Sequence, residues 1–140
     1  MKKITFYLTA MFFLFGGMTN VCAQFDFPGN GDGSSWENAY EVATVTQLDY
    51  LRTSGNKDKY FKLVNNIDLS EVANWDPIGD GSTAFEGKFD GNGFKISNLK
   101  INRPTEEFVG LFGKTMGTVG ATVLQNVIIE NATVVGNLKV

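Results

Sequence analysis

The chain has 140 residues, of which 43% are hydrophobic, and a formal net charge of −3. This length allows one domain with a sizeable core. The chain contains no His, which excludes Ser-His-Asp and Cys-His nucleophile systems as well as His-ligated zinc and haem sites. The acidic balance argues against nucleic acid as a partner, because phosphate backbones attract basic surfaces.

The chain begins with a pattern typical of a secretory signal peptide. Two lysines precede an apolar run over residues 4–17, and the small residues that follow fit cleavage before Gln24. The run is too short for a permanent membrane-spanning helix. We therefore expect residues 1–23 to be removed during export to the medium or the outer cell surface. Lipid attachment at Cys22 is the alternative, although the residues before it fit a lipobox poorly.

Cleavage would remove the only Cys, two of the twelve basic residues and none of the fifteen acidic ones, leaving a net charge of −5. A hydrophobic core must then stabilise the exported protein, because no disulfide can form. Residues 24–38 are rich in Gly, Ser, Asn and Pro, which predicts an extended lead-in. The folded part is expected over residues 39–140.

One helix is predicted near residues 44–53, after a short strand at residues 40–43. Thr44 is a suitable N-cap, and Gln47 stands three residues later, as in a capping box. The apolar residues of this stretch recur on one face of a helix: Val45, Leu48 and Leu51.

The rest of the chain repeats a six-residue pattern: apolar, any, Asn, apolar, any, apolar. Copies occupy residues 64–69, 96–101 and 124–129. The apolar positions change phase at each Asn, which indicates two short strands around a corner. Corners at intervals of about 30 residues predict an all-β fold, a parallel β-solenoid of about three coils. We expect a ladder of stacked side-chain amides from Asn66, Asn98 and Asn126.

A second repeat places two Phe residues on either side of a central Gly. It occurs as Phe-Glu-Gly-Lys-Phe at residues 85–89 and as Phe-Val-Gly-Leu-Phe at residues 108–112. Residues four apart face the same side of a strand. We therefore expect an interior column of four aromatic rings: Phe85, Phe89, Phe108 and Phe112.

Two further residues are candidate ligand contacts. Asp90 begins an Asp-Gly-Asn-Gly stretch that is not followed by the Lys-Ser or Lys-Thr of a phosphate-binding loop. A tight turn is the favoured interpretation, with a cation or sugar contact through Asp90 as the alternative. Trp75 could stack on a sugar ring, although a buried loop anchor is favoured. The sequence predicts no catalytic, cofactor or metal site.

Several stretches resemble the GLUG-motif proteins, bacterial secreted or surface proteins named for a Gly-Leu-x-Gly element. They are residues 110–113 (Gly-Leu-Phe-Gly), 85–93 followed by 96–99, 31–34 followed by 39–48, and 60–69. The resemblance covers roughly residues 31–135. It implies a right-handed parallel β-helix in large adhesin-like or protease-associated proteins, with no catalytic residues to carry over. Such proteins usually run through several more coils than this chain.

We therefore expect a non-catalytic secreted or cell-surface module that acts as an adhesin or scaffold and binds an extracellular glycan or protein. The alternative is a carbohydrate-binding or carbohydrate-active protein, because polysaccharide lyases and many glycan hydrolases use the same helix. Those enzymes need a groove with acid and base groups.

The two ends of the predicted solenoid differ. The helix near residues 44–53 should cover the first coil, whereas residues 123–135 form an apolar strand edge with one charged residue, Glu130. An uncovered edge is a template for further strands. It predicts either self-association through the C-terminal coil or a longer solenoid of which this chain is the beginning. No membrane span is expected.

Overall fold

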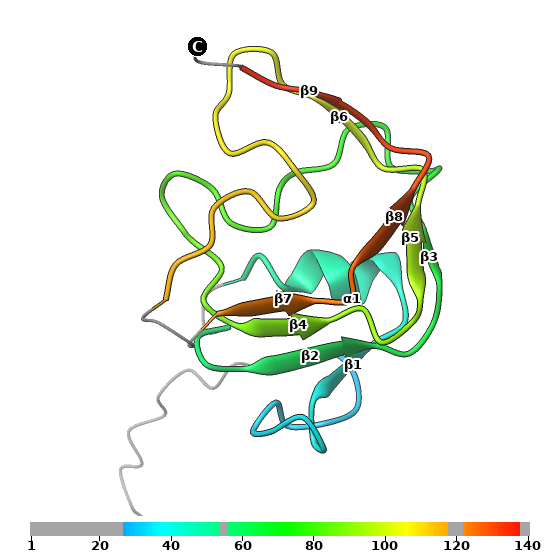
Figure 1. The fold of residues 1–140 in the computed structure, drawn as a ribbon, viewed down its shortest axis with the longest axis vertical. Coiled ribbons are helices and arrows are strands. Elements are labelled where there is room, and N and C mark those ends of the chain that lie inside the picture. Colours follow the sequence, from blue (N-terminus) through cyan, green and yellow to red (C-terminus); the bar gives the residue numbers. More distant parts are fainter. Residues whose placement is uncertain (1–26, 54–55, 118–121, 138–140) are drawn as a thin grey trace, which may run out of the picture.

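The computed structural model describes residues 27–53, 56–117 and 122–137, so the predicted signal peptide at residues 1–23 lies outside it. Within those ranges, no helix is long and apolar enough to cross a membrane. The regular secondary structure of the described part consists mainly of short strands (Figure 1). In chain order the elements are β1 Tyr40–Val42, α1 Val45–Tyr50, β2 Tyr60–Leu63, β3 Ile67–Asp68, β4 Lys88–Asp90, β5 Lys95–Ser97, β6 Lys100–Asn102, β7 Val123–Gln125, β8 Ile128–Glu130 and β9 Thr133–Val135.

The strands form three sheets in which every pairing is parallel. The first sheet has the order β1-β2-β4-β7, the second β3-β5-β8 and the third β6-β9. Figure 1 shows the strands of the first sheet one above another in that order, with β3, β5 and β8 overlaid beside them. Parallel neighbours need a long connection. The connection from β1 to β2 runs through α1, and each later connection runs through at least one strand of another sheet before it returns. The protein is therefore an all-β arrangement of parallel sheets.

The pairing register aligns apolar residues in rows that run across the sheets. In the first sheet, Phe61 lies opposite Phe89, which lies opposite Leu124. The second sheet has an equivalent row of Ile67, Ile96 and Ile129. The first two members of each row are buried, because alternate residues of a strand point to the same face and these point to the core.

The predicted ladder of three asparagines is wrong, because they do not occupy one corner. Asn66 and Asn126 lie where the chain passes from the first sheet to the second, whereas Asn98 lies between the second sheet and the third. The register places Asn126 beside Gly91 and Asn98 beside Asn131. The shared local pattern indicates a corner, but it does not say which corner the residue occupies.

We call each turn of the chain through the sheets a pass. Two corner asparagines, Asn98 and Asn126, bond to aspartates of the preceding pass. Asn98 Nδ2 donates to Asp68 Oδ1 at 2.8 Å, and Asn126 Nδ2 donates to Asp90 Oδ1 at 2.9 Å. The φ angles of Asn98 and Asn126 are 59° and 52°, in the left-handed region that Asn tolerates better than most residues. Asn98 and Asn126 therefore each serve their corner twice, through the backbone and through the side chain.

Three of the four predicted core phenylalanines share the interior. Phe85 and Phe89 are buried and Phe112 is half-buried, and the Phe112 ring centroid lies 5.1 Å from that of Phe85 and 5.2 Å from that of Phe89. The prediction is wrong for Phe108, whose side chain is 45% exposed. Its φ of 59° breaks the extended geometry on which the four-residue spacing argument depends.

The α1 helix occupies part of the predicted helical stretch. The Thr44 hydroxyl accepts the N–H of Gln47 at 3.2 Å, and the Gln47 side-chain oxygen accepts the N–H of Ala43 at 2.8 Å. These two bonds resemble a capping box, shifted by one residue on the return bond. Leu48 and Leu51 are buried in the hydrophobic core, so the helix covers apolar residues of the first pass.

Candidate functional site

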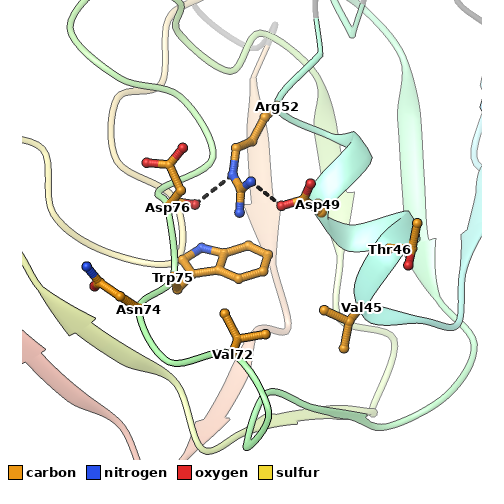
Figure 2. Close-up of a pocket in the computed structure, with 8 residues that line it drawn as sticks. All are labelled: Val45, Thr46, Asp49, Arg52, Val72, Asn74, Trp75 and Asp76. Carbon is orange, nitrogen blue, oxygen red and sulfur yellow. Dashed lines mark hydrogen bonds and ion pairs between the residues drawn. The ribbon is translucent and has the colours of Figure 1, made fainter.

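An open depression of about 290 Å³ lies between α1 and the loop over residues 72–76 (Figure 2). Its lining comes from both elements, with Val45, Thr46, Asp49 and Arg52 on the helical side and Val72, Asn74, Trp75 and Asp76 on the loop. The lining combines apolar side chains with a few polar and charged ones, which is a common composition for a small-ligand site.

Arg52 joins the helical side of the depression to the loop. Its Nε donates to the carbonyl oxygen of Asp76 at 2.7 Å, and its guanidinium forms an ion pair with Asp49. The guanidinium carbon also lies 4.4 Å from the centroid of the Trp75 ring, within the range of a cation–π contact. Figure 2 shows Arg52 extending across the indole between these partners.

Trp75 is a buried anchor and not a stacking platform. Its side chain is 1% exposed, and its Nε1 donates to the carbonyl oxygen of Leu111 at 3.2 Å. The same carbonyl accepts the backbone N–H of Ile78 at 2.9 Å. The Gly-Leu-Phe-Gly stretch is therefore held against the Trp75 loop. The candidate sugar contact through this ring is wrong, because no face of the indole is open to a ligand.

Other polar groups of the loop are also engaged within the chain. Asn74 Oδ1 accepts the backbone N–H of Asn102 at 2.8 Å. Arg103 forms an ion pair with the Asp76 carboxylate at 3.0 Å and another with Glu106 at 2.9 Å. The two arginines of the chain thus both hold the loop at residues 75–76 in place. On the helical side the exposed rim side chains are Thr46 and Asp49, and Asp49 is already paired with Arg52.

Asp90, the second candidate contact, stabilises a turn. Its carboxylate accepts the backbone N–H of Asn92 at 2.7 Å and the side-chain amides of Gln125 and Asn126 at 2.8 Å and 2.9 Å. Partial burial raises the pKa of Asp90, but these hydrogen bonds outweigh burial and hold the pKa below its ordinary value. The carboxylate is therefore ionised at neutral pH and already has three donors.

The Gly-Asn-Gly residues after Asp90 form the predicted tight turn. Asn92 and Gly93 have φ angles of 49° and 79°, and Phe94 donates its backbone N–H to the carbonyl oxygen of Gly91 at 2.8 Å. A Cβ at Gly91 would collide with the carbonyl oxygen of Asn126 on the next pass. Glycine is therefore needed here for close packing of two backbones.

Two structural residues were missed by the sequence analysis. Asp68 accepts both Asn98 Nδ2 and the backbone N–H of Ser70, and the bond from Asn98 contributes most to holding the pKa of Asp68 below its ordinary value. Asn56 is buried and donates to the carbonyl oxygen of Leu51 just after α1. Both roles could have been inferred from the sequence. Asp68 stands in an Asn-Ile-Asp-Leu stretch that forms a corner, and Asn56 follows the end of the predicted helix.

The described ranges contain no group of three or more His, Cys, Asp or Glu side chains close enough to hold a metal ion. Asp49 and Asp76 pair with arginines, whereas Asp68 and Asp90 accept hydrogen bonds from backbone and side-chain amides. Their arrangement stabilises turns and corners.

A second candidate site is the C-terminal edge, which we define as strands β7, β8 and β9. These are the last strands of the three sheets. All three burial patterns lack a buried residue. Strands that lie open in this way present apolar side chains and backbone groups to a partner.

Comparisons with known proteins identify two relatives. A protein named "Putative Gly-rich membrane protein" from Evansella cellulosilytica is 39% identical over 88 residues, which is 59% of this chain and 10% of that protein. Halomucin from Haloquadratum walsbyi is 36% identical over 122 residues, 79% of this chain and 1% of that protein. The chain thus spans a tenth or less of either relative. No family model and no solved structure matches it.

Proposed function

We propose that this chain is a non-catalytic β-solenoid module of a secreted or cell-surface protein, with an adhesin-like or scaffold role. The observation that carries the proposal is the stacking of successive passes in parallel register, with aligned apolar rows such as Phe61, Phe89 and Leu124. A solenoid of this kind extends by adding coils, so it suits a long surface structure.

The stretches that resemble GLUG-motif proteins support a right-handed parallel β-helix. The Gly-Leu-Phe-Gly element at residues 110–113 has a structural role that fits such a family. Its Leu111 carbonyl accepts bonds from Trp75 and Ile78 of the pass before it, and a Cβ at Gly113 would collide with the carbonyl oxygen of Gly79. The element therefore holds one pass against the next, which is a structural role and not a catalytic one.

The relatives support a surface location. One bears a membrane-protein name and the other is a halomucin, and each is far longer than this chain. A match of 122 residues that is only 1% of the halomucin fits a small module embedded in an extended protein. The predicted signal peptide at residues 1–23 also supports export from the cytoplasm.

A glycan-binding function is the second candidate, and the depression beside α1 is the observation that favours it. Its rim carries Asp49 and Thr46, which offer hydrogen-bond acceptors and a hydroxyl to a polar ligand. We do not assign it catalysis, because its two carboxylates, Asp49 and Asp76, form ion pairs with Arg52 and Arg103. A carbohydrate-active enzyme would need a free acid and a free base on either side of the bond to be cleaved.

Incubation of the exported protein with a panel of polysaccharides separates these functions. We expect no cleavage products. We expect the protein to be retained only on polysaccharides of the cell surface that carries it. Thr46→Trp would fill the depression, and Ser82→Trp is a matched control in an exposed loop away from it. Retention lost by the first variant alone would assign glycan binding to the depression. Cleavage of any polysaccharide would overturn the non-catalytic proposal.

A further inference from the structure

The outward face of the first sheet carries two aromatic rings that take no part in the core. In β2 the buried side chains are Phe61 and Leu63, so Tyr60 points to the opposite face. The Tyr60 side chain is half-buried, and so is Trp36 in the stretch before β1. Neither ring belongs to the hydrophobic core of the described residues or to the half-buried side chains packed against it. Trp and Tyr that are not used in a core are typical of binding surfaces.

Trp36 is held beside Tyr60 by the chain that precedes β1. The backbone N–H of Tyr60 donates to the carbonyl oxygen of Gly33 at 3.1 Å, and Lys59 Nζ donates to the carbonyl oxygen of Asp32 at 3.3 Å. The ring centroids of Trp36 and Tyr60 lie 5.0 Å apart, at an interplanar angle of 81°. Because both rings are only half-buried in this edge-to-face arrangement, part of each is accessible to a ligand.

Lys88 lies beside these rings on the neighbouring strand. The pairing of β2 with β4 places Lys88 opposite Tyr60, and the ammonium nitrogen lies 4.5 Å from the Tyr60 ring centroid, within the range of a cation–π contact. Among the described residues, no carboxylate forms an ion pair with Lys88. We call Trp36, Tyr60 and Lys88 the outer cluster. Its ammonium can still donate hydrogen bonds to an anion.

The other outward charges of these strands are engaged within the protein. Lys62 forms an ion pair with Glu41 at 3.6 Å. The Asp90 carboxylate accepts three amide hydrogen bonds. Lys88 is therefore the outward cation of the first sheet that no carboxylate offsets. The exported chain is acidic as a whole, but the Debye length is about 8 Å at physiological ionic strength, so distant carboxylates act weakly on an anion held at Lys88.

The outer cluster faces sideways from the stack of passes. The strands of the first sheet follow one another within the plane of the sheet (Figure 1), whereas outward side chains project from the face of that plane. A strand that paired with β1 or β7 would extend this face without covering it. The accessibility of the outer cluster is therefore a property of the face and not of either end of the sheet.

We propose that the outer cluster binds an anionic polysaccharide. A carboxylate or sulfate group of the polysaccharide accepts a charge-assisted hydrogen bond from the Lys88 ammonium, and the apolar face of a neighbouring sugar ring packs against the accessible parts of Trp36 and Tyr60. The inference rests on the extracellular location in the proposed function, because such polysaccharides are met outside the cell. It does not rest on the depression beside α1, with which the outer cluster shares no residue.

Binding to matched pairs of polysaccharides tests the ligand class. The probes are polygalacturonate with its carboxyl-reduced form and dextran sulfate with dextran, used as stand-ins for anionic and neutral surface polysaccharides in affinity electrophoresis of the exported protein. At least one anionic member should bind at least about threefold more tightly than its neutral partner, and added salt should weaken that binding. The pair that differs identifies the anionic group. Equal binding within both pairs, or binding to none of the probes, would overturn the proposal.

Substitutions test whether the outer cluster is the site. Lys88→Gln should weaken binding to the anionic probe about threefold, and Lys88→Glu should weaken it further. Trp36→Ala should cost about fivefold or more, provided that circular dichroism shows it folded. Lys100→Gln is the matched control, because it removes an exposed lysine from β6 in another sheet, and it should change nothing. Anionic binding that survives both Lys88 variants would overturn the assignment.

The same assay separates this inference from the proposed function. Thr46→Trp, which fills the depression, should leave anionic binding intact, and binding lost by Thr46→Trp but not by Lys88→Gln would place the ligand in the depression and overturn the outer cluster. A scaffold role needs no glycan, so absence of binding would overturn this inference alone. Recovery of the chain in the cytoplasmic fraction of its cell would instead contradict the proposed surface location, and the inference with it.

Discussion

At the residue scale, corner asparagines combine a backbone role with a side-chain role. Asn98, Asn126 and Asn131 have φ angles of 59°, 52° and 54°, where β-branched or large side chains are strained. Two of them also donate to an aspartate of the previous pass. The pairs Asp68–Asn98 and Asp90–Asn126 connect successive passes at two different corners.

The two roles of Asn98 can be separated by substitution. Asn98→Leu loses the bond to Asp68, and it places at a φ of 59° a side chain that cannot form hydrogen bonds with nearby backbone. It should therefore lower the free energy of unfolding by about 1–3 kcal/mol. Asn98→Gly loses the bond but accepts the φ angle, and it should cost less. Chemical denaturation measures both. Equal losses would show that the backbone conformation contributes nothing.

The Asp90 carboxylate predicts a pH dependence of stability. Its folded-state pKa lies below the ordinary value, so ionised Asp90 stabilises the folded state above its unfolded-state pKa of about 3.9, and this contribution is lost as the pH falls through the folded pKa. Asp90→Asn should therefore reduce stability at pH 7. At a pH below both pKa values the two proteins should converge, since wild-type Asp90 is then neutral. A constant difference from pH 7 to the acid limit would contradict this origin.

At the scale of single elements, short strands are stable here because they share aromatic residues. Phe112 contacts both Phe85 and Phe89, and Phe85 also lies 6.0 Å from Phe61 between ring centroids. A strand of three residues buries little surface alone. Rings that reach across passes supply the apolar contact that such strands cannot supply to themselves.

The phenylalanines should differ in their contribution to stability in the order of their burial. Phe85→Ala removes a buried ring and should cost about 3–5 kcal/mol of unfolding free energy. Phe112→Ala should cost less, because the ring is half-buried. Phe108→Ala, at an exposed position, is the control and should change stability by about 0.5 kcal/mol or less. Thermal melts give the ranking, and a large effect of Phe108 would contradict its exposed placement.

At the scale of the whole molecule, the two ends of the fold are unequal. The first pass is covered by α1 and by residues 27–38, whereas the last pass leaves β7, β8 and β9 with no buried residue. Terminal repeats of stacked architectures depend on such covers.

This inequality predicts a gradient of hydrogen exchange. Amides of β7, β8 and β9 should exchange faster than those of β4 and β5, because local opening of an exposed terminal strand costs little. Uniform protection across the strands would contradict the exposure of β7, β8 and β9.

Local features of the fold were determined by the sequence alone. Thr44 and Gln47 predict the start of α1 because a capping arrangement is complete within a few residues. The change of apolar phase at Asn98 predicts a corner for the same reason, and the apolar, nearly uncharged run at residues 123–135 predicts the open strands β7 to β9.

Only the tertiary structure decided which residues stand opposite one another. Phe61 and Phe89 are 28 residues apart and Phe89 and Leu124 are 35 apart, so loops of different length separate equivalent strands. Because register depends on those lengths, Asn126 is placed beside Gly91 instead of Asn98. The exposure of Phe108 has the same origin, since a side chain's burial depends on what the neighbouring passes place over it, which no local pattern contains.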